Sequence, residues 1–169
     1  GQEVSFDFSV GGGEQSAETK SAPASSTPSS TASAQPELPE SAIGEFIAES
    51  EEIVERISQC LQLVESGQFK KENIDGLYRD IHSLKGAAYL FSYTDLGNLA
   101  HAMESSLERV RAGTHKPSRV QINALFRGVK LIDTIIDRLK QKAPYPKISA
   151  AIPALAKVLA TAAERLEPI

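Results

Sequence analysis

The chain has 169 residues, 41% hydrophobic and 24% charged, which is enough apolar material for one domain of ordinary size with a tail. Its single cysteine, Cys60, excludes an internal disulfide and a cysteine-based zinc site. The first 40 residues hold six acids and one base, whereas residues 41–169 hold 16 acids and 17 bases. This nearly neutral body argues against nucleic-acid binding, which requires a strong basic excess.

The sequence also argues against a membrane protein. The chain does not open with a basic segment followed by an apolar one, as a signal peptide does. Its most apolar stretch, residues 148–163, is interrupted by Pro153 and Lys157 and is too short to span a bilayer. We therefore expect a cytoplasmic, mostly helical protein without a membrane partner.

Residues 1–40 are predicted to be a disordered tail or linker. Between residues 14 and 40, Ser, Thr, Ala and Pro fill 19 of 27 positions, and Leu38 is the one large apolar side chain. Such a segment cannot bury enough apolar surface to offset the entropy lost on ordering. Residues 4–10 alternate apolar and polar side chains in a strand-like pattern before three glycines. We interpret them as a possible docking peptide or the end of an upstream module.

From Ser41 onwards the apolar residues recur at helical spacing in five segments. The first runs from Ile43 to Val64, with Ser50 interrupting the series and Gly67 as a stop signal. The next three cover residues 77–91, 94–113 with Thr94 as the cap, and 122–139; the fifth covers 148–166. Short connections make neighbouring helices antiparallel. The prediction is an all-α, up-and-down four-helix bundle with an additional fifth C-terminal helix, spanning residues 41–169 and preceded by the disordered tail.

The informative polar residues lie beside the apolar stripes. On the second segment, His82 follows a core position, Lys85 lies one turn further along, and Gly86 leaves the next patch of helix surface bare. On the third segment, His101 and Glu104 lie across from His82 if the two helices form a hairpin. A carboxylate that accepts the Nδ1 proton of His82 leaves Nε2 as a free nucleophile. Lys85 is then placed to stabilise an anionic group, most naturally a phosphoryl group, on that nitrogen.

Two other interpretations stay open at this point. The chain can be a non-catalytic helical interaction module whose histidines are incidental. As a minor variant, His82, His101 and Glu104 can form a metal site between helices, although Lys85 would place a cation next to the ion. His115, in the loop before Pro117, lacks comparable neighbours and is expected to be solvated.

The run from Leu77 to Ala88 resembles the phosphoacceptor helix of histidine-containing phosphotransfer (HPt) domains, whose His-x-x-Lys-Gly-x-(small) motif it meets in full. Residues 99–104 and 107–113 are similar to the next helix in the branch of chemotaxis kinases called CheA, and residues 46–52 resemble its first helix. The resemblance covers about residues 41–140. The sequence departs from the branch at Phe91-Ser92, where CheA-type domains usually have Phe-Gly.

The resemblance implies a role for each site residue in a two-component signalling system. His82 would be phosphorylated, Lys85 would stabilise the phosphoryl group, and Glu104 would orient the ring. His101 would support the network and Gly86 would give partners access. A CheA-type kinase domain would supply ATP and Mg²⁺, since this domain is expected to bind no cofactor or metal itself. A CheY- or CheB-like receiver would take the phosphoryl group. The chain would thus be a relay and not an enzyme, monomeric in isolation, within a protein-histidine kinase.

Overall fold

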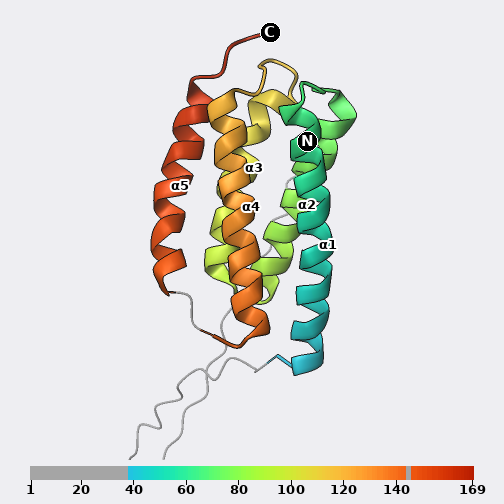
Figure 1. The fold of residues 1–169 in the computed structure, drawn as a ribbon, viewed down its shortest axis with the longest axis vertical. Helices are drawn as coiled ribbons and strands as arrows, with labels where there is room; N and C mark the ends of the chain where they lie inside the picture. The colour runs from blue at the N-terminus through green and yellow to red at the C-terminus, as the bar shows by residue number, and fades with distance from the viewer. Residues whose placement is uncertain (1–37, 144–145) are drawn as a thin grey trace, which may run out of the picture. The chain divides into compact units, whose positions relative to one another are not determined.

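The amphipathic segments of the sequence form five helices in the structure, a computed structural model that describes residues 38–143 and 146–169. The helices are α1 (Glu40–Glu65), α2 (Lys71–Leu90), α3 (Thr94–Arg111), α4 (Arg119–Lys140) and α5 (Pro146–Glu164). Consecutive helices run in opposite directions, as the ribbon in Figure 1 shows. The predicted all-α, up-and-down bundle with a fifth helix is therefore confirmed. The predicted tail and the strand-like residues 4–10 lie outside the described residues.

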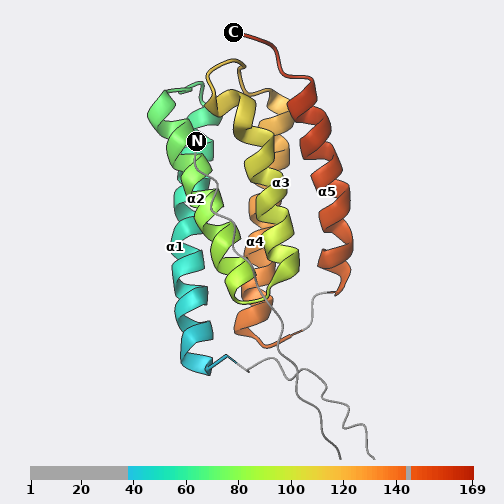
Figure 2. The same cartoon turned by 180° about the vertical axis from the view of Figure 1, so that it is seen from behind.

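Four helices form a closed ring, and the fifth covers one side of it. Helix α1 packs against α2 and α4, and α3 completes the ring by packing against the same two helices. Helix α5 lies against α3 and α4, so α2 has no helix over its outer face. The view from behind, in Figure 2, shows α2 and α3 side by side in front of the other ring helices. This arrangement leaves one face of the α2–α3 pair open to solvent.

The core follows the helical periodicity of the sequence. On α2, Leu77, Ile81 and Leu84 are completely buried, and they meet an equally buried stripe from α3 that includes Leu99 and Met103. Positions three and four residues apart lie on one face of a helix, so a stripe with this spacing turns its whole apolar face inward. The residues between the stripe positions stay at the surface, and this group includes His82.

Four of the five helices end in the same hydrogen-bonded turn, in which the residue after the C-cap takes a left-handed conformation. Gly67 and Gly113 occupy this position after α1 and α3, with φ of 90° and 73°. This outcome confirms Gly67 as the stop signal read from the sequence. After α2 and α4 the position is held by Ser92 and Lys142, with φ of 62° and 53°. The hairpin into α3 therefore has the backbone of a glycine turn without the glycine.

Several local expectations were wrong. Thr94 is the first residue of α3 and not its cap; the N-cap is Tyr93, which makes no side-chain capping bond. Ser50 does not interrupt the buried stripe of α1, because a small hydroxyl side chain fits there and is only 1% exposed. Helix α2 starts earlier than its apolar series indicated, at Lys71, and adds Ile74 to a second, smaller cluster of buried residues.

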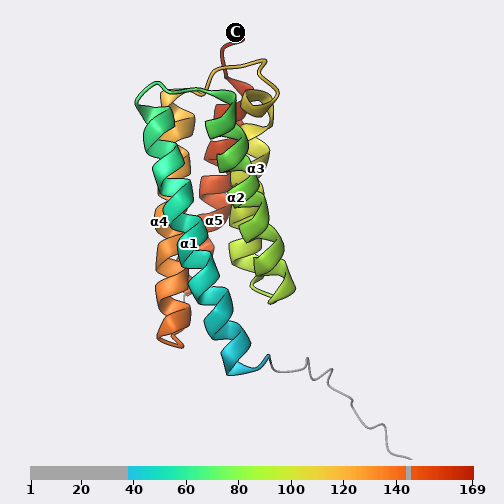
Figure 3. The same ribbon diagram turned by 90° about the vertical axis from the view of Figure 1, so that its right-hand side faces the viewer.

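The C-terminal residues close one end of the bundle. Past α5, the chain pairs with the loop between α3 and α4, where Lys116 N donates to Glu167 O at 3.1 Å and Ile169 N donates to Thr114 O at 3.0 Å. His115, predicted to be solvated, is bridged to Pro168 and is half-buried. Figure 3 shows this end at the top, opposite the turn between α2 and α3.

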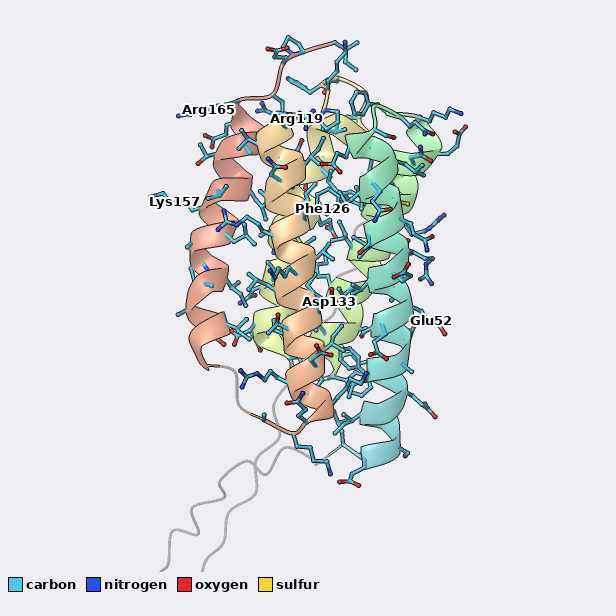
Figure 4. All side chains as sticks on the ribbon, in the orientation of Figure 1. Glu52, Arg119, Phe126, Asp133, Lys157 and Arg165 are labelled. Carbon is cyan, nitrogen blue, oxygen red and sulfur yellow. The ribbon has the colours of Figure 1, made fainter. Side chains whose placement is uncertain are left out.

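Charged side chains lie on the outer side of α5 and just beyond it. Figure 4 shows Lys157 on α5 and Arg165 just beyond it pointing away from the other helices. In the part of the chain that the structure describes, none of the helices combines the length and the apolar character that a membrane crossing needs.

Candidate functional site

The site is centred on an exposed histidine whose helix is firmly anchored. Ile81, the residue before His82, is fully buried in the core, and Leu84 is fully buried on the same stripe. The His82 side chain is 62% exposed. A rigid backbone thus presents the imidazole to solvent on the uncovered face of α2. A catalytic or acceptor group on a regular helix is positioned more precisely than one on a loop.

Glu104 reaches His82 from the neighbouring helix. It is the one buried carboxylate among the described residues, with a side chain that is 8% exposed. Its Oε2 lies 2.8 Å from His82 Nδ1, and its Oε1 lies 2.9 Å from Lys85 Nζ. The predicted contact across the α2–α3 hairpin is therefore present. The close packing of these two antiparallel helices brings a residue 22 positions away in sequence against the ring.

The charge of Glu104 is stabilised inside this cluster. Burial on its own would raise the pKa of Glu104, but hydrogen bonds and attraction from Lys85 and His82 more than offset that effect. The pKa of Glu104 consequently lies below its ordinary value of 4.5. Glu104 is therefore a carboxylate, and an acceptor only, at neutral pH.

An ionised Glu104 fixes the proton on His82. A carboxylate oxygen 2.8 Å from Nδ1 accepts a hydrogen bond, so the neutral imidazole carries its proton on Nδ1. The lone pair is then on Nε2, the nitrogen that is not held by Glu104. The geometry thus prepares an exposed ring nitrogen for attack on an electrophile.

Lys85 and Gly86 lie where the sequence predicted. The Lys85 side chain is 20% exposed, and its ammonium shares Glu104 with the His82 ring. A Cβ atom added to Gly86 would meet nothing within 4 Å, so the helix surface beside His82 is open. A larger side chain would fit there without a clash inside this chain. Packing within the chain therefore does not explain why this position is a glycine.

His101 does not join the cluster. It is exposed on α3, and no hydrogen bond or ion pair connects it to His82 or Glu104 in the structure. In residues 38–143 and 146–169, no group of three or more His, Cys, Asp or Glu side chains could hold a metal ion. The alternative metal set of His82, His101 and Glu104 is accordingly not assembled.

Sequence reasoning missed a tyrosine and an arginine beside the site. Tyr78 lies one turn before His82 on α2, and its ring is stacked with the imidazole at an interplanar angle of 10° and a centroid distance of 6.5 Å. The Tyr78 hydroxyl donates to Glu104 Oε1 at 3.4 Å, and Arg111 Cζ lies 4.1 Å from the centre of the Tyr78 ring. The spacing of four residues between Tyr78 and His82 already indicates that the two rings are neighbours on one helix. Nothing in the local sequence points to Arg111.

The fold and the site together define a helical bundle that presents a histidine, oriented by a buried carboxylate, on its surface. Comparison with known proteins identifies the family: the model of the Hpt domain matches residues 41–142, which include every predicted site residue. The chain belongs to the Hpt domain family.

Two relatives agree with this assignment. Chemotaxis protein CheA of Halobacterium salinarum is 30% identical over 95 residues, covering 56% of this chain and 14% of the relative. CheA of Bacillus subtilis is 28% identical over 94 residues, with the same shares. The chain thus spans only 14% of the length of either relative.

Two solved structures have the same fold. One is the phosphorylated P1 domain of CheA3 in complex with CheY6 from R. sphaeroides, with a TM-score of 0.67 and 14% identity over 76% of this chain and 100% of that one. The other is a histidine phosphotransfer domain of CheA, with a TM-score of 0.66 and 22% identity over 73% of this chain and 92% of that one.

Proposed function

We propose that His82 of this Hpt domain accepts a phosphoryl group on Nε2 from an ATP-dependent, CheA-type kinase domain and passes it to an aspartate of a receiver domain. The observation that carries the proposal is the contact of 2.8 Å between His82 Nδ1 and the buried, ionised Glu104. That contact leaves the opposite ring nitrogen unprotonated, at the exposed edge of the ring.

The first transfer uses the lone pair of Nε2. This nitrogen attacks the γ-phosphorus of ATP, the bond from phosphorus to the bridging oxygen breaks, and ADP leaves with that electron pair. The Nδ1 proton stays on the ring, which becomes cationic as the nitrogen–phosphorus bond forms. Glu104 faces that developing charge at hydrogen-bond distance. Such transfer depends on positioning and charge more than on proton exchange.

Lys85 completes the acceptor. Its ammonium contacts the same carboxylate as the His82 ring and is only partly exposed, so it can turn towards the equatorial oxygens of an incoming phosphoryl group. Gly86 leaves room for the partner that delivers or removes that group. His101, which the resemblance places in the supporting network, makes no contact with the acceptor, so we assign it no part in the transfer.

In the second transfer His82 is the leaving group. A carboxylate oxygen of the receiver attacks phosphorus, the nitrogen–phosphorus bond breaks, and its electron pair returns to Nε2 of a neutral ring. The solved complex of a CheA3 P1 domain with CheY6 supports a receiver as the partner. The uncovered face of α2 continues past Gly86 to an exposed side chain, Leu90 at 78%, which offers apolar contact.

In this proposal the chain is a relay within a cytoplasmic histidine kinase. The kinase domain binds ATP and Mg²⁺ for the first transfer, and the receiver supplies its own Mg²⁺ for the second. The described residues act as substrate, as orienting groups and as a docking surface. The support comes from the match to Hpt domains and from the CheA relatives, whose remaining length lies outside this chain.

A labelling experiment tests the proposal. The chain is incubated with labelled ATP, Mg²⁺ and the catalytic core of a CheA-type kinase, next to His82→Gln and His101→Gln variants. We expect label that is labile in acid and stable in base on wild type and His101→Gln, and none on His82→Gln. Added receiver should then remove it. Label that survives in His82→Gln refutes the assignment of His82 as the acceptor. If the wild-type chain is folded but none of the kinase cores labels it, the alternative of a non-catalytic helical interaction module is favoured.

A further inference from the structure

The oxygen Oε1 of Glu104 has two donors, and one of them has a second task in the proposed reaction. Lys85 Nζ donates to Oε1 at 2.9 Å, and the Tyr78 hydroxyl donates to the same oxygen at 3.4 Å. Once Nε2 of His82 carries a phosphoryl group, the ammonium of Lys85 is attracted to the oxygens of that group. Oε1 is then left with the weaker of its two donors.

A buried carboxylate oxygen needs a partner in both states. The Glu104 side chain is 8% exposed, so water can replace a lost donor only in part. An unsatisfied buried acceptor is unfavourable. If Oε1 lost both donors, Glu104 could turn, and Oε2 would leave the position that it holds against His82 Nδ1. The Tyr78 hydroxyl is the donor that does not take part in phosphoryl contact and can shorten its bond to Oε1 as Lys85 moves.

The Tyr78 ring packs against Arg111, which also forms an ion pair between α2 and α3. Arg111 of α3 lies over the ring, at a distance that allows a cation–π contact. The Arg111 Nε atom in turn lies 3.4 Å from Asp75 Oδ1, and the other carboxylate oxygen of Asp75 accepts from Lys71 Nζ at 2.8 Å. A chain of contacts therefore runs from Asp75 through Arg111 and Tyr78 to Glu104.

We propose that Tyr78 is a positioning residue that holds Glu104 Oε1 when Lys85 turns to a phosphoryl group on His82, and that Arg111, anchored by Asp75, fixes the Tyr78 ring. This inference rests on the proposed function of His82 and deepens it. It distinguishes two states of the site: a resting state in which Lys85 is the main donor to Glu104, and a phosphorylated state in which Tyr78 takes that part.

The matched test compares Tyr78→Phe with Tyr89→Phe. Both changes remove one hydroxyl from α2, but that of Tyr89 donates to Asn98 at 2.8 Å, outside the site. We expect Tyr78→Phe to lower the maximal rate of labelling about 3- to 10-fold with an unchanged KM for the domain. The equilibrium constant for phosphorylation, obtained from the phosphorylated fraction at a fixed ATP-to-ADP ratio, should fall by a similar factor. Tyr89→Phe should match wild type in both.

Two readouts separate positioning from a general structural role. The tautomer of unphosphorylated His82, read from its ¹⁵N shifts, should stay unchanged in Tyr78→Phe, because Lys85 still holds Oε1. In a Glu104→Ala background, Tyr78→Phe should have no further effect, because the acceptor of the Tyr78 hydroxyl is gone. Arg111→Gln should reproduce part of the loss, with the exposed Arg109→Gln of the same helix as its control.

The outcomes distinguish this inference from the proposed function. If wild type is labelled and Tyr78→Phe equals it in maximal rate and in equilibrium, the inference is wrong while the proposed function stands. If Tyr78→Phe shifts the resting tautomer or still lowers the rate in the Glu104→Ala background, Tyr78 acts by another route and the inference is also wrong. If wild type is not labelled at His82, both fail.

Discussion

Replacing Glu104 with glutamine removes the charge at the centre of the site and nearly preserves the side-chain shape. In the structure this carboxylate accepts from His82 at 2.8 Å and from Lys85 at 2.9 Å while its side chain is 8% exposed. A hydrogen bond to a charged group contributes about 1.5–3 kcal/mol. Since about 1.4 kcal/mol corresponds to a tenfold change in rate, we expect Glu104→Gln to slow labelling of His82 about 10- to 100-fold.

The same variant should lose stability in a manner that depends on pH. The pKa of Glu104 is lowered in the folded chain, because the donors outweigh burial, so its contribution is fully present above the ordinary value of 4.5. That contribution is lost as pH falls through the lower, folded pKa. We expect the free energy of unfolding of Glu104→Gln to be about 1–2 kcal/mol smaller at pH 7, and the difference from wild type to shrink below pH 4.5.

Initial rates of labelling and urea denaturation at a series of pH values provide the two measurements. The exposed Glu108→Gln, one turn further along α3, is the matched control and should behave as wild type. Equal labelling rates for wild type, Glu104→Gln and Glu108→Gln would refute the role of Glu104. A stability difference that grows as pH falls below 4.5 would refute the ionised carboxylate.

Three further substitutions have expected outcomes. Gly86→Ala should raise stability by about 0.5–1 kcal/mol, because an added Cβ meets nothing within 4 Å; it should also slow transfer to the receiver, and an unchanged transfer rate would remove the access role. Ser92→Gly should stabilise the fold by about 0.5–1 kcal/mol, because φ is 62° there and glycine adopts this left-handed conformation without strain. A lower free energy of unfolding in urea denaturation would contradict this. Gly128→Ala should destabilise, because its Cβ would lie 2.7 Å from the sulfur of the fully buried Met103; truncating that side chain to valine should rescue the variant, and no rescue would point to another cause.

The sequence predicted the bundle because each helix keeps a long apolar stripe, and a stripe of this kind has one way to be buried. The α2 residues that the stripe placed inside are 0% exposed up to Ala88. The helix ends were less predictable where the residue type at a turn does not match its backbone conformation. Ser92 takes a left-handed conformation because the hydrogen bonds of the turn, from Ser92 N to Tyr89 O and from Tyr93 N to Ala88 O, require it.

The site was predictable where it depends on helical spacing and much less where it depends on packing between helices. His82, Lys85 and Gly86 share a face by spacing alone, and an antiparallel hairpin brings Glu104 opposite. The same reasoning placed His101 at the site, yet its side chain lies in solvent. His101 and Glu104 are three positions apart and lie on neighbouring parts of one helix face. The rotation of α3 that buries Glu104 and leaves His101 exposed depends on core contacts that the sequence does not show.

The most direct test of the proposed function is to identify the histidine nitrogen that carries the phosphoryl group. The chain is labelled with ¹⁵N in its histidines, phosphorylated by a CheA-type kinase core, and examined by NMR for coupling between phosphorus and nitrogen. We expect coupling to Nε2 of His82 alone, with the proton retained on Nδ1 next to Glu104. Coupling to Nδ1 of His82, or to either nitrogen of His101 or His115, would contradict it.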